Sequence, residues 1–476
     1  MKKILTAAAC VIAGLTIGLC GCFLPTAKNG KDGADGKDGK DGQNVTVFDY
    51  YELAKTVEGQ ENMTVDEFLK KYMSYTKEEL EAEFAPQRNA NRSLLSAVSI
   101  LTGFTLSTTV SSKTVNYNAV YSGAGVIVDI DKEKGDAYVV TNCHVVYNDA
   151  AASSISSDIR LYLYGQDAEG VNYNLKSKII KNTFTETVYE TTVYGDEDYR
   201  INAKVVAASI ANDIALLKIT GSDVLKNSGA IAAEFEESDD VYVKEDVYAI
   251  GNPGGEGMSV TSGTISKESQ FIQLNLSDRY ANSENYYLDY RVIGTDTAIN
   301  GGNSGGGLFS SKTGKLVGIV NSKNVGEDID NMGYALPGNI VKRLWKLMRD
   351  KFEDRGGSYA TTTGIDCVVF SAGCAAKSTG AYWDNEKGVA VIEEKVVVTS
   401  YKTMSEGNEF RINDVVTHIK ISGSDGTVYE DRDVTRVYHL NDTLISARAG
   451  DKIEITVLRG GEKVVVTYTA TTSRVK

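Results

Sequence analysis

Hydrophobic and polar positions follow a helical period in the first part of the chain. Over residues 45–100, two capping boxes of the form Thr-x-x-Glu begin at Thr64 and Thr76. Apolar residues at helical spacing follow the boxes, among them Phe68, Leu69 and Leu80. Because a capping box satisfies the free amides at the start of a helix, the pattern predicts that this region is helical.

Short apolar runs separated by glycine and polar turns replace this period from about residue 101 to 336. The runs lie at 125–130, 137–141, 214–219, 241–250 and 315–320. Their spacing predicts an all-β barrel or sandwich. Two long polar stretches, 172–200 and 267–290, lie between such runs, and we expect them to form surface loops or hairpins.

A helix and a second β-rich region complete the pattern. Pro337 precedes apolar residues spaced along one helical face, and Gly356 and Gly357 would stop the helix. This stop marks a predicted domain boundary. Within residues 361–476, strands are predicted around 389–392, 415–419, 453–458 and 464–468.

The N-terminus has the pattern of a secretory signal, with a basic start at residues 1–3 and an apolar stretch over 4–19. The sequence Leu-Cys-Gly-Cys that follows resembles a bacterial lipoprotein signal, in which an enzyme cuts before a cysteine and attaches lipid to it. Cys22 is the predicted lipidation site because Gly21 precedes it, and Cys20 is the alternative. An ordinary secretory signal with incidental cysteines is the other reading.

Glycine then recurs at every third position from Gly30 to Gly42. This is the collagen period, but the tract is short and has no proline, so it should not hold a triple helix alone. We interpret it as a solvated spacer that lifts the protein off the membrane.

Composition narrows the range of functions. The chain has 476 residues, which favours two or more domains. Its 50 Lys and Arg against 64 Asp and Glu give a net charge of −14, so we expect no nucleic-acid partner. The sequence has no CxxC pair or histidine-rich cluster with metal spacing, and no cofactor or metal is predicted. Calcium in the acidic turn 195–198 is an alternative that we rank below a solvated turn.

Three of the six cysteines lie beyond the signal region. Cys143 directly precedes a histidine, and we interpret it as a small buried hydrophobe rather than a nucleophile. Cys367 and Cys374 could pair in an oxidising compartment.

Three positions carry the candidate chemistry. The chain has only three histidines, and His144 lies at the end of an apolar run, where a barrel would fix it while leaving it accessible. Asp213 directly precedes another apolar run, where its carboxylate can accept a hydrogen bond from the imidazole. Ser304 lies among glycines that leave its hydroxyl accessible. The order His, Asp, Ser matches one known arrangement of a catalytic triad.

The glycines around Ser304 also let backbone amides converge, and those of Gly302 and Ser304 are the predicted oxyanion hole. The same stretch satisfies the G-x-S-x-G elbow of α/β-hydrolases, which requires a helix after the serine and a base further on. A turn at 312–314 and an apolar run follow instead, and His418 and His439 lie in the separate C-terminal region. We therefore reject the elbow.

Six segments resemble the HtrA family of PDZ-bearing, trypsin-fold serine proteases. They are 122–128, 140–146, 212–219, 249–254, 295–306 and 333–337. The resemblance implies two six-stranded β-barrels with the active site between them. It assigns the roles of base, orienting acid and nucleophile to His144, Asp213 and Ser304, and it suggests a homotrimer.

Residues 361–476 resemble the PDZ module of that family, which binds a C-terminal peptide by adding it to a sheet edge. By this resemblance, Gly364 and Ile365 would help form the carboxylate loop, and C-terminal peptides are predicted partners. Thr363 stands where the family often has a larger apolar residue, and the turn at Asn413 and Asp414 departs from the commoner Gly-Asp.

Two further positions bear on specificity and activation. Ala298 is expected at the base of the specificity pocket. Without an acid there, cleavage after small or medium apolar residues is predicted over cleavage after Lys or Arg. Asn303 stands where digestive relatives have an aspartate that pairs with a new N-terminal amine, so we favour activation by loop ordering.

The predicted fold class is mainly β, with a chymotrypsin-like double barrel followed by a PDZ-like domain and a short N-terminal helical region. The predicted parts are a signal peptide (1–21), a lipid anchor and spacer (22–44), a helical region (45–100), a trypsin-like protease domain (101–345), a linker (346–360) and the PDZ-like domain (361–476).

The predicted function is that of a serine endopeptidase, lipid-anchored on the outer face of the bacterial cytoplasmic membrane or on the cell surface. Its predicted substrates are misfolded or damaged exported proteins. The alternative is a PDZ-dependent chaperone or binding protein with weak or absent proteolysis. A structural surface protein built around the collagen-like tract is a third reading, for which the tract is too short.

Overall fold

The computed structural model describes most of the chain from residue 51 onward. The described ranges are 51–52, 54–56, 61–73, 77–110, 112–166, 176–179, 189–192, 199–237, 241–275, 287–323, 332–359, 372–401 and 410–470. Outside them lie the predicted signal peptide, the spacer, the 195–198 turn and several predicted residues: Cys22, Gly364, Ile365 and Cys367. The chain divides into two compact units, Met1–Pro86 and Gln87–Lys476.

The first unit contains a capped helix. Helix α3 (Val65–Phe68) continues as a π-helical turn over Leu69–Met73. The hydroxyl of Thr64 accepts the amide N–H of Glu67, and the Glu67 carboxylate accepts that of Thr64, as the capping box predicts. Phe68 is buried and packs edge-on against Tyr51, with ring centroids 5.6 Å apart. Helix α4 (Lys77–Ser93) occupies the position that the second box predicts.

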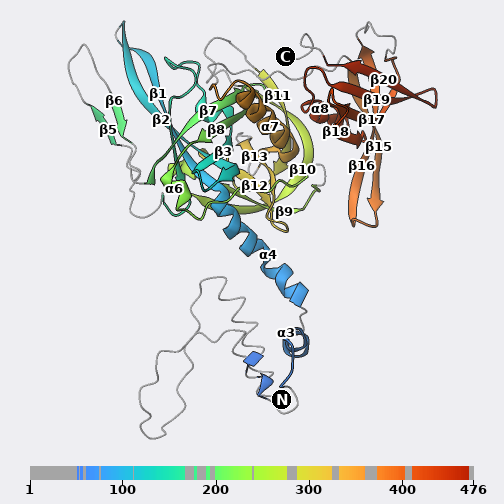
Figure 1. Cartoon of the computed structure of the whole chain (residues 1–476), viewed down its shortest axis with the longest axis horizontal. Coiled ribbons are helices and arrows are strands. Elements are labelled where there is room, and N and C mark those ends of the chain that lie inside the picture. Colours follow the sequence, from blue (N-terminus) through green and yellow to red (C-terminus); the bar gives the residue numbers. More distant parts are fainter. Residues whose placement is uncertain are drawn as a thin grey trace. The chain divides into compact units, whose positions relative to one another are not determined.

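Six antiparallel strands close the first barrel of the second unit (Figure 1). In barrel order they are β1 (Ala97–Val110), β2 (Lys113–Asp131), β3 (Asp136–Thr141), β8 (Ile214–Ile219), β7 (Ile201–Ser209) and β4 (Asp158–Leu163). A 3-10 turn, Leu94–Ser96, leads directly into β1. The predicted helical region therefore extends too far at residues 97–100, where apolar side chains such as Val98 and Ile100 are buried in the sheet.

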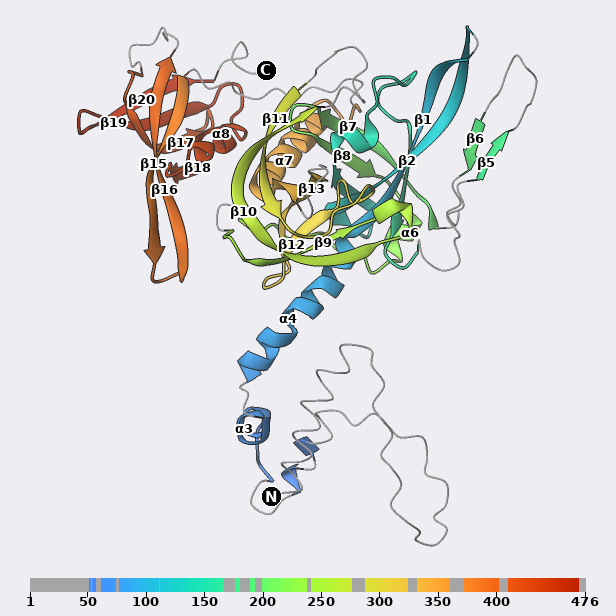
Figure 2. The same ribbon diagram turned by 180° about the vertical axis from the view of Figure 1, so that it is seen from behind.

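Six further strands close the second barrel, which Figure 2 shows from behind. They are β10 (Ser259–Asn275), β11 (Tyr287–Thr295), β14 (Gly333–Pro337), β13 (Leu316–Lys323), β12 (Gly307–Ser310) and β9 (Asp246–Gly251). The strand predicted over 241–250 begins only at Asp246. Before it, the Glu245 amide donates to the Tyr242 carbonyl in a turn, and Lys244 has a φ of +72°.

Both polar stretches between the apolar runs contain hairpins, as predicted. Strands β5 (Lys176–Ile179) and β6 (Tyr189–Thr192) pair as a separate two-stranded sheet. Strands β10 and β11 continue their pairing as far as Asn275 and Tyr287. Short helices α5 (Cys143–Val146) and α6 (Asp223–Lys226) and a 3-10 turn, Pro253–Gly255, lie between other strands.

Helix α7 (Gly338–Asp354) packs its apolar face on the barrels. Pro337 is its N-cap, and Gly356 and Gly357 follow its end with φ of +65° and +79°, as predicted. Its buried side chains join an apolar cluster with residues of both barrels: Ile340, Val341, Leu344, Trp345, Met348 and Phe352. The predicted domain end at 345 and linker over 346–360 cut through this helix, because its second half is also held by the core.

A third sheet follows, with strand order β15-β16-β17-β19-β20 and with β18 paired to β17. Its elements are β15 (Ala372–Asp384), β16 (Val389–Tyr401), β17 (Val415–Ser422), β18 (Val428–Asp433), α8 (Val437–Leu444), β19 (Lys452–Arg459) and β20 (Glu462–Thr469). The four strands predicted in this region are all present, and the sheet has an apolar core of its own. The mainly β fold, a double barrel followed by a further β domain, is thus confirmed.

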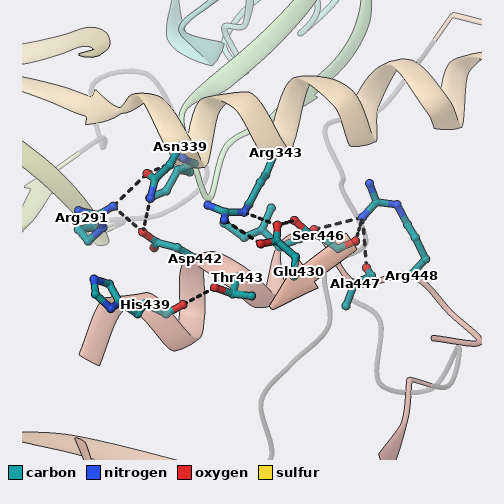
Figure 3. Close-up of polar contacts among 12 residues, drawn as sticks. Arg291, Asn339, Arg343, Glu430, His439, Asp442, Thr443, Ser446, Ala447 and Arg448 are labelled. Atoms are coloured by element: carbon teal, nitrogen blue, oxygen red, sulfur yellow. Dashed lines mark hydrogen bonds and ion pairs between the residues drawn. The ribbon is translucent and has the colours of Figure 1, made fainter. Parts of the chain in front are cut away.

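Charged side chains join this third sheet to the barrels (Figure 3). We call this contact the domain seam and define it by Arg291, Asn339 and Arg343 on one side and by Glu430, Asp442 and Ser446 on the other. The Arg291 guanidinium donates to the Asp442 carboxylate, and their side chains are 3% and 4% exposed. Arg343 donates to both oxygens of Glu430, at 2.9 and 3.1 Å.

Within the described part of the chain, no helix is both long and apolar enough to cross a membrane.

Candidate active site

His144 lies on the short helix α5, directly after strand β3. Strand β3 is almost wholly buried, so it fixes the position of α5 at the end of the first barrel. The neighbours Cys143 and Val145 are buried in that barrel's core, whereas the His144 side chain is 13% exposed. The ring is therefore held by its helix and remains accessible, and Cys143 is the buried hydrophobe that the sequence predicts.

Asp213 lies in the turn between β7 and β8, with a φ of +46° in the left-handed region. Its Oδ2 is 2.7 Å from His144 Nδ1, and its Oδ1 accepts the His144 backbone N–H at 2.9 Å. Asn142 adds a hydrogen bond from Nδ2 to the Asp213 carbonyl at 3.0 Å. Because both carboxylate oxygens bind the same residue, the imidazole has a fixed orientation.

Ser304 lies in a loop whose glycines permit close approach. Gly302 has a φ of +98°, and a Cβ there would lie 2.0 Å from the Asn252 carbonyl oxygen. Gly305 has a φ of +85°, and a Cβ there would lie 2.2 Å from Thr141 Oγ1 in β3. Only glycine fits either position. The second approach sets the Ser304 loop against the strand that leads to His144.

The backbone of Ser304 is tied to both barrels. Its carbonyl accepts the amide N–H of Ala124 in β2 at 2.9 Å, while the amide of Gly305 donates to the carbonyl of Val320 in β13 at 2.9 Å. The Ser304 hydroxyl donates to the carbonyl oxygen of Asn321 at 3.3 Å. The structure thus brings His144, Asp213 and Ser304 to the junction of the two barrels.

The two predicted oxyanion donors lie in the same loop. Among the residues that the structure describes, the amides of Gly302 and Ser304 have no protein acceptor, whereas the intervening Asn303 amide donates to the Asn300 carbonyl at 3.0 Å. Two amide groups on either side of Asn303 are therefore left to bind an oxygen atom.

Ala298 precedes this loop and is exposed. Its carbonyl accepts hydrogen bonds from Thr261 Oγ1 at 3.1 Å and from Asn303 Nδ2 at 3.5 Å. The Asn303 side chain is buried and turned toward Ala298.

The remaining histidines lie in the C-terminal region, outside the two barrels. His418 in β17 lies between Asp431 and Asp433, at 2.7 and 3.0 Å, and His439 is in α8. Strand β12, rather than a helix, follows Ser304, so the elbow reading is excluded on structural grounds.

Asn142 and Asn321 are the site residues that sequence reasoning missed. Asn142 lies in the segment 140–146, two positions before His144, and this place in the sequence marks it as a neighbour of the candidate base. Asn321 lies at the end of a predicted strand and has no local signature.

Known proteins are similar to this part of the chain. Residues 123–319 match the family model described as a trypsin-like peptidase domain. The chain is 26% identical over 347 residues to "Serine protease Do-like HtrA" of Bacillus subtilis, covering 72% of this chain and 62% of that protein. It is 34% identical over 228 residues to "Periplasmic serine endoprotease DegP" of Escherichia coli, covering 48% of this chain and 35% of that protein.

A solved structure, "HtrA-type protease AlgW with decapeptide", aligns at 21% identity and a TM-score of 0.45, covering 82% of this chain and 98% of that one. The chain spans about 62% of the length of this Bacillus subtilis protein and of a second relative from the same organism, "Serine protease Do-like HtrB".

Fold and site together define a trypsin-like peptidase domain, with all three candidate residues inside the matched range. Over the compared residues, the chain is similar to the HtrA and DegP serine proteases.

Proposed function

We propose that this chain is a serine endopeptidase that degrades misfolded or damaged exported proteins at the cell surface. One observation carries the proposal. The ring of His144 is fixed by Asp213 at 2.7 Å, next to a glycine loop that presents Ser304. Such an arrangement is suited to acyl transfer, in which a base activates a hydroxyl and an acid orients that base.

The reaction would start when Ser304 Oγ attacks the carbonyl carbon of the peptide bond. His144 accepts the hydroxyl proton and later donates it to the leaving amine. Asp213 keeps Nδ1 protonated, so that Nε2 is the nitrogen that can act as the base. Because the Asp213 carboxylate is only 4% exposed, water screens its interaction with the imidazolium weakly.

The tetrahedral intermediate carries a negative charge on its oxygen. The amides of Gly302 and Ser304 are the donors we assign to that oxyanion, since no acceptor among the described residues occupies them. Each such donor can stabilise the transition state by about 3 kcal/mol.

Ala298 is the residue that we place at the base of the specificity pocket. A methyl side chain there supplies no counter-charge, which favours small or medium apolar residues before the cleaved bond. Replacing it by aspartate, Ala298→Asp, should favour substrates with Lys or Arg at that position.

We further propose that Cys22 is lipidated and that the third sheet is a PDZ-like domain that binds C-terminal peptides through Gly364 and Ile365. The sequence around Cys22 supports the first assignment, and the resemblance of residues 361–476 to the PDZ module supports the second. The name of the Escherichia coli relative, a periplasmic endoprotease, agrees with a place of action outside the cytoplasm.

Casein degradation tests the proposal. The chain lacking residues 1–22 should degrade casein, and its Ser304→Ala variant should not. If neither does, even with C-terminal peptides added, the chain acts as a binding protein or chaperone. Equal cleavage by both would mean that Ser304 is not the nucleophile.

A further inference from the structure

A cavity of about 540 Å³ lies along the domain seam. One wall comes from helix α7, and the opposite wall comes from the C-terminal region, where Glu430 lies in β18 and Arg448 follows α8. Figure 3 shows four of its lining residues, Arg343, Glu430, Ser446 and Arg448. A cavity of this volume lies in the range that small-molecule ligands occupy.

Two lysines of α7 line the cavity without an acidic partner. Lys342 and Lys346 lie one helical turn apart, and like charges at this spacing repel each other. Neither forms an ion pair within the part of the chain that the structure describes. Partial burial lowers the pKa of Lys346, and the neighbouring charges of Lys342 and Arg349 lower it further. An anion between the two ammonium groups would relieve this repulsion.

Arg448 adds a cation from the opposite wall. Its Nη1 donates to the carbonyl of Ser446 at 2.6 Å and to that of Ile445 at 3.2 Å, at the end of α8. These bonds fix the guanidinium in place. Arg343, by contrast, binds both oxygens of Glu430, so its charge is already neutralised.

The acidic side chains of the lining do not compensate the lysines. Three of the four accept hydrogen bonds from other groups: Glu430 from Arg343, Asp350 from Arg349, and Asp451 from the Arg448 amide. The fourth, Glu237, is exposed. A small anion can therefore approach the two lysines without displacing a carboxylate from either of them.

The charges favour a phosphate group as the ligand. Two ammonium groups and a guanidinium on facing walls suit a ligand with two negative charges and several acceptor oxygens. The chain as a whole has a net charge of −14 and repels anions, so affinity for phosphate would have to come from a local site.

We propose that this cavity binds a small soluble phosphate compound, with its phosphate group held by Lys342 and Lys346 of α7 and by Arg448 after α8. Such a ligand would touch both sides of the domain seam and hold the third sheet on the barrels, because a ligand stabilises the form that binds it. The inference goes beyond the proposed function, since no residue of the candidate triad lines the cavity.

Titration calorimetry with the full chain tests the site, with inorganic phosphate, pyrophosphate and glycerol phosphate as probes. The double variant Lys342→Gln with Lys346→Gln should bind phosphate at least about tenfold more weakly than the parent, because two charge-assisted hydrogen bonds are lost. Arg343 stays unchanged in this test, since it supports the seam through Glu430. Saturating phosphate should also slow hydrogen exchange in α7 and α8 of the parent.

The matched control is the double variant Lys377→Gln with Lys395→Gln. These two exposed lysines also face each other, across strands β15 and β16, and lie outside the cavity. The control changes the net charge by the same amount, and it should bind phosphate as the parent does.

Equal phosphate affinity in the parent and in the variant of Lys342 and Lys346 would overturn the site, and so would a failure of all three probes to bind. Hydrogen exchange locates the site without any variant, and phosphate-dependent protection confined to other elements would also overturn it. Vesicles that contain phosphatidic acid separate a lipid headgroup from a soluble ligand. Binding to these vesicles without binding to the soluble probes would contradict the proposal. A parent that fails to cleave casein would overturn the proposed function, whereas phosphate binding decides this site alone.

Discussion

The junction between the two barrels and the domain seam use opposite chemistry. The largest apolar cluster crosses the junction, with Val140 and Leu216 from the first barrel packed together with Ile250 and Leu336 from the second. The seam instead relies on ion pairs such as Arg291 with Asp442. Apolar burial is insensitive to pH and tolerates small shifts, whereas a buried ion pair depends on geometry and on charge.

From this contrast we predict where each kind of substitution should act. The candidate triad residues lie on the apolar junction, so we expect their replacement to alter the chemical step with little effect on stability. The seam residues lie away from the triad, so their replacement should alter the attachment of the third sheet with little effect on the chemical step.

The largest effect is expected from Asp213→Asn. The amide can keep the contacts in place, but it no longer favours the tautomer with a proton on Nδ1, so kcat should fall about 10⁴-fold. Steady-state cleavage of a peptide substrate measures the loss, and thermal unfolding should show a melting temperature close to that of the parent. A loss below tenfold would contradict the role of Asp213.

The next largest effect is expected from Asp442→Ala at the seam. Two nitrogens of Arg291, Nε and Nη1, are buried without an acceptor in the described part of the chain. The charge is balanced by Asp442, by Asn339 Oδ1 at 3.2 Å and by the ring of Tyr438, 4.2 Å away. Removing Asp442 leaves that charge buried and should destabilise the attached third sheet by about 3–5 kcal/mol. Hydrogen exchange of α8 and urea unfolding measure the change.

Asp350→Ala is the control for this experiment. Asp350 pairs with Arg349 on the more exposed part of α7, where its side chain is 47% exposed, and an exposed pair contributes little. A loss for Asp442→Ala no greater than for Asp350→Ala would contradict the importance of the buried pair. The double variant Arg291→Met with Asp442→Leu should recover most of the stability, since neither charge is then left alone.

Lowering the pH should have a smaller effect on the stability of the domain seam. Burial tends to raise the pKa of Glu430, but hydrogen bonds and charge from Arg343 outweigh it and hold the pKa below the ordinary value. A carboxyl with a lowered pKa in the folded state stabilises the fold at neutral pH. That stability is lost as pH falls from the ordinary value of about 4.3 toward the lower folded value.

Between pH 7 and pH 3, this loss should weaken the seam by about 1 kcal/mol. Hydrogen exchange in β18 and α8 measures it. In Glu430→Gln, which does not titrate, the seam should already be weaker at pH 7 and should lack this part of the pH dependence. An identical pH dependence in parent and variant would refute the assignment to Glu430.

Local patterns predicted the barrels well, because each strand depends on a short run of sequence, and short runs also mark the three candidate triad residues. His144, Asp213 and Ser304 each adjoin an apolar strand or a glycine run, and helix α7 has its proline start and glycine stop. Helix α7 continues past residue 345, and periodicity alone does not reveal that its second half packs on a distant core.

Contacts between distant segments were beyond sequence reasoning. Asn321 and Asp213 are separated by 108 positions, and Arg291 and Asp442 by 151. Each of these residues is of a type that is common on protein surfaces, so its sequence position gives no sign of burial. Only the folded sheets bring the partners together. The start of β9 was missed for a local reason, since a turn at Lys244 interrupts a run of residues with high strand propensity.

The shared apolar cluster determines how the molecule unfolds. Because the two barrels and α7 share one apolar cluster, opening either barrel exposes part of the other, and they should melt in a single cooperative step. The third sheet has a separate core and should melt independently once its ion pairs are broken. Exchange of that sheet between related chains is therefore feasible as a unit, whereas exchange of one barrel alone is not.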